Sequence, residues 1–239
     1  SWSACKYGVN TTFQRYNMVA NFIRNMKALI YDAYPRVDIA DSWTNVCKNV
    51  EKLKLVMKCT MVRWCKPMSG MVKLNSDGSF YRDTELAGIG GTLRNDQGDL
   101  IMAYSIPIRS NSHNQTEAIA VKFGIEWCVQ NGFDNVHIEL DSLVIKNMID
   151  NKDTNNLKLK HIVSSIIRIL NGINYCTSHC YREANQLADY MAKLAATSGN
   201  RAFYHSQNLP REAKGMLQLD KWQVPNFRRR YEKSNFFVS

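Results

Sequence analysis

The order of apolar segments and turn residues between positions 72 and 196 constrains the fold more than any other feature. Three strand-like segments with short connections come first, at residues 72–78, 87–93 and 100–108. Short connections predict an antiparallel meander. The segments that follow alternate in type, with helical spacing at 115–131, 142–149, 157–170 and 185–196 and strands at 136–140 and 173–180. Strands joined through helices are most simply parallel. The order βββαβααβα therefore predicts an α/β fold, a mixed five-stranded sheet with helices on both faces.

The two flanks of this central region are patterned differently. Helices are expected at 11–33 and 42–50, followed by an extended arm at 53–66. After Gly199 the periodicity weakens, and basic residues alternate with aromatic ones, which favours an extended basic tail. The sequence thus predicts a basic N-terminal extension (1–70), a central domain (71–199) and a basic aromatic C-terminal tail (200–239).

Charge is unevenly distributed along the chain. The net charge is +10, to which residues 1–70 contribute +7, the centre −2 and residues 200–239 +5. Basic surfaces attract polyanions such as nucleic acid, although basic flanks also serve solubility alone. The sequence contains no run of 18 apolar residues, so no membrane span is expected. Seven cysteines without a CxxC pair predict reduced thiols in an intracellular protein, whether of nucleus, cytoplasm or organelle.

Four acidic residues lie where the predicted elements begin or end: Asp77, Glu117, Asp141 and Asp189. Each has a local explanation, namely a turn, a helix dipole, a helix N-cap and an ion pair with Lys193. In the predicted fold, however, all four can meet at one end of the sheet. Four carboxylates together repel one another unless cations neutralise them, which favours a site for divalent metal, with magnesium as the expected ion.

Residues 71–198 resemble a ribonuclease H domain of the type 1 superfamily, and most closely the plant domains found in non-LTR retrotransposons and their domesticated relatives. The matching stretches are Lys73–Ser79, Ala87–Gly91, Leu93–Gly98, Gln115–Ala118, Glu139–Ser142 and His179–Asp189. They cover about half of the chain. Each stretch alone is weak, but their combination is specific.

This resemblance implies that Asp77, Glu117, Asp141 and Asp189 hold two Mg²⁺ ions, with Mn²⁺ as an alternative, and hydrolyse the RNA strand of an RNA–DNA hybrid. It gives His179 a role in proton transfer or product release. Nucleic-acid contacts are expected at Ser79, Asn114, Gln115, Arg182, Asn185, Arg228, Arg229 and Arg230. Helix capping is the alternative explanation for Asn114 and Gln115.

Two departures from the family pattern weaken the expected grip on substrate. Residues 80–86 replace a glycine-rich turn, and residues 147–160 lack the basic protrusion of some family enzymes. Two functions therefore remain. The first is a two-metal endoribonuclease. The second is a domesticated domain that serves as an RNA-binding or structural subunit of a large ribonucleoprotein, such as an organellar ribosome.

Overall fold

The computed structural model describes residues 56–83 and 86–232, together with the single helical positions 20, 24, 27, 28 and 44. The chain divides into two compact units, one of residues 1–59 with 229–239 and one of residues 60–228. Apart from the five single positions, the helices predicted at 11–33 and 42–50 lie outside the described residues. Within the described residues, no helix is long and apolar enough to cross a membrane.

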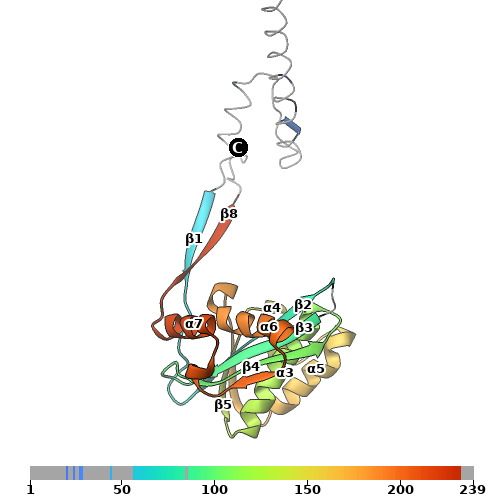
Figure 1. Cartoon of the computed structure of the whole chain (residues 1–239). Helices are drawn as coiled ribbons and strands as arrows, with labels where there is room; N and C mark the ends of the chain where they lie inside the picture. The colour runs from blue at the N-terminus through green and yellow to red at the C-terminus, as the bar shows by residue number, and fades with distance from the viewer. Residues whose placement is uncertain are drawn as a thin grey trace, which may run out of the picture. The chain divides into compact units, whose positions relative to one another are not determined.

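The larger unit is built on a six-stranded mixed sheet (Figure 1). Its strands are β2 (Val72–Tyr81), β3 (Leu86–Arg94), β4 (Leu100–Arg109), β5 (Asn135–Leu140), β6 (Asn174–His179) and β7 (Arg201–Phe203). They lie in the order β6-β5-β2-β3-β4-β7. Strands β2, β3 and β4 form an antiparallel meander, and β5 pairs in parallel with both β2 and β6. The predicted five strands and their directions are confirmed, and β7 adds a short sixth strand.

Helices cover both faces of this sheet, as the sequence predicts. They are α3 (His113–Gln130), α4 (Leu143–Asp150), α5 (Leu157–Leu170), α6 (Gln186–Ser198) and α7 (Arg211–Lys221), with short 3-10 helices η1 (Arg182–Ala184) and η2 (Ser206–Asn208). Side chains alternate between the faces along β4. Met102 and Tyr104 belong to the core shared with α3, α4 and α5, whereas Ala103 belongs to the core shared with α6 and α7.

The prediction that the first strand ends at an Asp77-Gly78 turn is wrong. Strand β2 continues to Tyr81, and Asp77 and Gly78 pair with Gly90 and Ile89 of β3. The ladder of hydrogen bonds to β3 satisfies the backbone there, so the local turn preference of Asp-Gly is overridden. Asp77 is consequently a buried mid-strand residue rather than a turn residue.

The prediction of an extended tail after Gly199 is wrong for residues 201–221. Strand β7 pairs antiparallel with β4, and helix α7 follows. Phe203, Leu209 and Leu217 are buried in the core under α6. The sequence analysis missed α7 because most of its residues are polar or charged and only Ala213 and Leu217, one helical turn apart, are buried.

Strands β1 (Val56–Val62) and β8 (Asn226–Glu232) form a separate two-stranded sheet. Strand β1 falls within the extended arm predicted at 53–66. Trp64, immediately beyond it, is almost fully buried, with 1% of its surface exposed. The end of this segment is therefore part of the folded unit of residues 60–228.

Candidate active site

Two of the four predicted carboxylates come from neighbouring parallel strands. In the β2–β5 pairing, Asn75 lies opposite Glu139, so Asp77 and Asp141 follow two residues later on the two strands. Residues two apart in a strand share a face of the sheet. Asp141 stands directly after β5, and the N-cap of α4 is Ser142 rather than Asp141. Ser142 therefore caps the helix, which is the role that the local explanation gave to Asp141. The Asp141 carboxylate is left for other contacts.

The other two carboxylates are delivered by helices. Glu117 lies in the second turn of α3, which begins at His113 and is capped by Ser112 rather than by Asn114 or Thr116. Helix α3 approaches β2 very closely at Gly78, where a Cβ atom would meet the backbone nitrogen of Glu117 at 2.5 Å. Asp189 lies in the first turn of α6. Strand β5 and helices α3 and α6 all pack against β2, so the four predicted acids come from elements that meet there.

The pKa values of these acids reflect their burial and the charges of their neighbours. Burial, reinforced by the charges of Asp141 and Asp189 and more weakly by that of Glu117, raises the pKa of Asp77 from 3.8 to about 8. Burial also raises the pKa of Glu117 and of Asp141 above their ordinary values. A carboxyl group that resists ionisation because of burial and like charges is typical of a cation or catalytic site.

Asp189 differs from the other three. Burial alone would raise its pKa, but hydrogen bonds and charges from Arg182 and Lys193 outweigh burial, and the pKa lies below its ordinary value. Arg182 Nη2 donates to Asp189 Oδ1 at 2.8 Å, and Lys193 Nζ donates to Oδ2 at 2.5 Å. The ion pair with Lys193, the local alternative for Asp189, is thus present alongside the cluster.

The donor set fits hard divalent cations in its chemistry. Carboxylate oxygens are the ligands that magnesium prefers, and one of them, Glu117 Oε2, is buried with no hydrogen-bond partner among the described residues. In this conformation no three acidic, histidine or cysteine side chains of the described residues stand close enough to share one ion. Asp189, held by its two basic partners, is the carboxylate whose two oxygens are already engaged.

His179, the predicted catalytic histidine, lies at the end of β6 and is exposed. Its Nε2 atom is 3.2 Å from the backbone oxygen of Asp141, and its ring packs edge-on against Tyr181. These contacts place the imidazole beside the backbone of a predicted metal ligand while leaving it open to solvent.

Asn185, predicted to contact nucleic acid, does something else in this structure. It is 1% exposed, and its side-chain nitrogen donates to the Ser76 backbone oxygen at 3.1 Å and to Asp141 Oδ1 at 3.2 Å. A side chain this buried cannot reach a nucleic acid without rearrangement. It instead ties the start of α6 to β2 and orients the Asp141 carboxylate.

The remaining predicted nucleic-acid contacts are spread over several elements. Ser79 is half-buried on β2 and Asn114 is exposed on α3. Gln115 Oε1 accepts from the backbone nitrogen of Asn111 at 3.1 Å, which is a capping contact at the helix start. Arg182 is exposed beside Asp189.

The three predicted tail arginines are not equivalent. Arg228 forms an ion pair with Glu183 of η1, Nη1 to Oε2 at 3.1 Å, and its guanidinium lies 4.5 Å from the Tyr181 ring centroid. It therefore packs on the loop that leads into α6. Arg229 and Arg230 are exposed residues of β8 and belong to the other compact unit.

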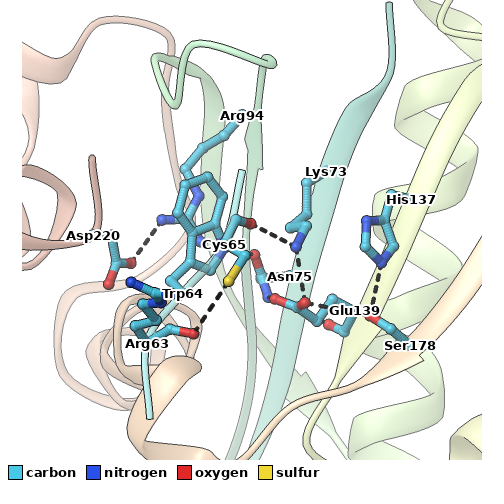
Figure 2. A network of polar contacts seen from close by, with 10 residues as sticks. All are labelled: Arg63, Trp64, Cys65, Lys73, Asn75, Arg94, His137, Glu139, Ser178 and Asp220. Atoms are coloured by element: carbon cyan, nitrogen blue, oxygen red, sulfur yellow. Dashed lines mark hydrogen bonds and ion pairs between the residues drawn. The ribbon is translucent and has the colours of Figure 1, made fainter. Parts of the chain in front are cut away.

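A buried polar network, which the sequence analysis missed, lies two residues behind Asp77 and Asp141 on the same two strands (Figure 2). Lys73 Nζ donates to Glu139 Oε1 at 2.8 Å and to the Cys65 backbone oxygen at 2.7 Å. Asn75 donates to Glu139 Oε2 at 3.0 Å. In the sequence, the polar residues Lys73 and Asn75 flank the apolar Leu74. Such alternation usually indicates a strand with one face in solvent, so it did not point to a buried network.

The same network includes residues from both ends of the unit of residues 60–228, namely Trp64 and Asp220. The Arg94 guanidinium stacks on the Trp64 ring, 3.7 Å from its centroid, and donates to Asn75 Oδ1 and Asp220 Oδ2, both at 2.7 Å (Figure 2). Arg94 is 1% exposed. A buried charge without a partner is costly, so the ion pair with Asp220 of α7 stabilises the buried Arg94 guanidinium. The network thus joins the N-terminal segment, the sheet and α7 behind the carboxylate cluster.

Comparison with known proteins agrees with this architecture. The model of a family described as Reverse transcriptase-like matches residues 75–195. A protein of Arabidopsis thaliana named "Putative ribonuclease H protein" is 31% identical over 140 residues, which are 56% of this chain and 22% of the relative. The chain therefore spans well under two thirds of that relative's length.

Two solved structures share the fold. RNase H1 from the halophilic archaeon Halobacterium salinarum NRC-1 matches with a TM-score of 0.50 and 25% identity, over 53% of this chain and 97% of that one. The N-terminal RNase H domain of a Mycobacterium tuberculosis protein matches with a TM-score of 0.50 and 17% identity, over 53% of this chain and 93% of that one. The second likeness concerns the fold alone.

Proposed function

Because the chain belongs to the Reverse transcriptase-like family and carries a ribonuclease H-like domain, we propose that it is an endonuclease that hydrolyses the RNA strand of RNA–DNA hybrids. The observation that carries this proposal is the convergence of four carboxylates from two strands and two helices. Burial, reinforced by the charges of the other three carboxylates, raises the pKa of Asp77 to about 8. Such a cluster costs folding free energy, and binding of divalent cations would repay that cost.

Asp77, Glu117, Asp141 and Asp189 would hold the cations. Two bound Mg²⁺ ions would supply an activated water and stabilise the leaving oxygen of the scissile phosphodiester. Asn185 keeps the Asp141 carboxylate oriented through its 3.2 Å hydrogen bond. His179 is exposed beside the Asp141 backbone and would assist proton transfer or product release there.

The test is cleavage of a labelled RNA strand, paired with DNA, in the presence and absence of Mg²⁺. We expect metal-dependent cutting by the wild type. Asp77→Asn and Asp141→Asn should each lose activity on the order of a hundredfold or more, since even partners that only orient metal ligands typically contribute 10–100-fold. Asp134→Asn is the matched control, because Asp134 is exposed and precedes β5, whereas Asp141 follows the other end of that strand.

A second candidate function is an RNA-binding or structural subunit of a ribonucleoprotein. The ion pairs that engage both oxygens of Asp189 favour it, as does the concentration of basic charge outside the central domain. A well-folded wild type that never cuts the hybrid, yet binds RNA with strong salt dependence, would replace the endonuclease with this function.

A further inference from the structure

Asp189 is the carboxylate of the cluster with cationic partners on both oxygens. Arg182, in η1, reaches it from one side at 2.8 Å, and Lys193, one helical turn further along α6, reaches it from the other at 2.5 Å. The Asp189 side chain is 18% exposed, whereas those of Arg182 and Lys193 are 63% and 50% exposed. The two basic side chains are therefore much more accessible to solvent than the carboxylate with which they pair.

Arg182 also acts on the rest of the cluster. Its positive charge lowers the pKa of Glu117 and of Asp141, in opposition to their burial. Its own pKa is raised, first by the hydrogen bond to Asp189 and then by the charges of Asp189, Asp77 and Asp141. The charge of a single guanidinium thus acts on all four carboxylates and offsets part of their repulsion.

We propose that Arg182 and Lys193 are internal counter-ions of the carboxylate cluster, which a divalent cation must displace from Asp189 in order to bind. This inference rests on the proposed function, because it concerns the same metal site. A metal ion needs an Asp189 oxygen that is not already paired. Its apparent affinity is therefore reduced by the fraction of molecules in which Asp189 is free.

Competition of this kind predicts that the variants differ from the wild type in thermal stability mainly when metal is absent. In EDTA, Arg182→Gln should lower the melting temperature, because the cluster loses a neutralising charge. With saturating Mg²⁺ the difference from the wild type should shrink or vanish. The dissociation constant for Mg²⁺ should fall by about two- to fivefold in Arg182→Gln and in Lys193→Gln, the range expected for loss of one exposed ion pair.

The experiment is isothermal titration of the metal-free full chain with MgCl₂, paired with thermal unfolding in EDTA and in Mg²⁺. Arg182→Lys keeps the charge and should bind Mg²⁺ nearly as the wild type does. Arg211→Gln removes one exposed arginine from α7 and controls for net charge. Because Arg182 and Lys193 are largely exposed, their variants are expected to fold.

The outcomes separate the two claims. Tighter Mg²⁺ binding in Arg182→Gln and Lys193→Gln, with Arg211→Gln unchanged, supports the counter-ions. Equal or weaker binding in both variants, while the wild type binds Mg²⁺ and Asp77→Asn does not, overturns the counter-ions and leaves the proposed function standing. A wild type that binds no Mg²⁺ overturns both.

Discussion

Asp77 shows how one residue can be costly to the fold and still belong to the site. It is 5% exposed, its Oδ1 accepts from the Gly78 backbone nitrogen at 2.8 Å, and three other carboxylates act on it. One backbone hydrogen bond does not offset burial and like charge, so the folded protein favours the protonated form. Binding of a cation would reverse this preference.

The sign of the resulting pH dependence follows from that pKa. The folded state holds a proton at Asp77 up to pH 8 or so, whereas the unfolded chain releases it near 3.8. The stability linked to Asp77 is therefore fully present below pH 3.8 and is lost as the pH rises through about 8. In EDTA we expect urea denaturation to show that Asp77→Asn is more stable than the wild type at pH 9, with no such advantage at pH 3.5. A constant difference between the two proteins over this range would contradict it.

At the scale of elements, the contact between β2 and α3 decides where Glu117 lies. Gly78 permits it, since a Cβ there would come within 2.5 Å of Glu117 N and 2.6 Å of Thr116 C, both backbone atoms that cannot rotate away. Helix α6 docks on β3 in the same manner, because a Cβ on Gly90 would lie 2.0 Å from Ala192 N. Two glycines thus set the distance at which both helices deliver their acids.

Gly78→Ala should therefore push α3 away from β2. We expect a loss of about 1–3 kcal/mol in the free energy of unfolding, as for other overpacked sites, together with reduced hybrid cleavage. Denaturant titration and the cleavage assay measure the two effects. Gly215→Ala is the control: with nothing within 4 Å of its Cβ in helix α7, it should gain about 0.5–1 kcal/mol. Equal stability changes in the two variants would refute the close-approach argument.

At the scale of the whole unit of residues 60–228, charges buried behind the carboxylates join segments that are far apart in sequence. Arg94 of β3 packs on Trp64 and pairs with Asp220 of α7. The Asp220 side chain is 12% exposed and that of Arg94 only 1%. The segment after Gly199 is thus structural up to α7, and its removal would leave a buried guanidinium without its carboxylate.

Asp220→Ala isolates that effect from the loss of a whole segment. Removing one partner of a buried pair typically costs about 3–5 kcal/mol, because the remaining charge is uncompensated. Asp99→Ala removes the partner of Lys221 from a pair whose side chains are 52% and 39% exposed, and should cost less than about 1 kcal/mol. The free energy of unfolding from denaturant titration checks both values. Comparable losses would show that the Arg94 pair is not specially dependent on Asp220.

The order of the central elements and the mixed sheet could be predicted from the sequence, which also singled out the four acids as candidate site residues. Hydrophobic periodicity and connection length are local properties, so strands β2 to β6 and helices α3 to α6 could be read within a few residues of their ends. The resemblance added His179, whose Nε2 atom lies 3.2 Å from the backbone oxygen of Asp141.

The roles of the polar residues depend on contacts that exist only in the folded chain. Asn185 and Lys73 look like surface residues in the sequence but are buried, because their partners Asp141 and Glu139 come from a strand that is distant along the chain. Asp77 is a strand residue, because β3 supplies its backbone partners. The ion pair of Asp189 with Lys193 is a local contact that the sequence already predicted. Hydrogen bonds and ion pairs between distant segments leave no periodic trace, so the buried network around Arg94 and Glu139 could be found only once the chain was folded.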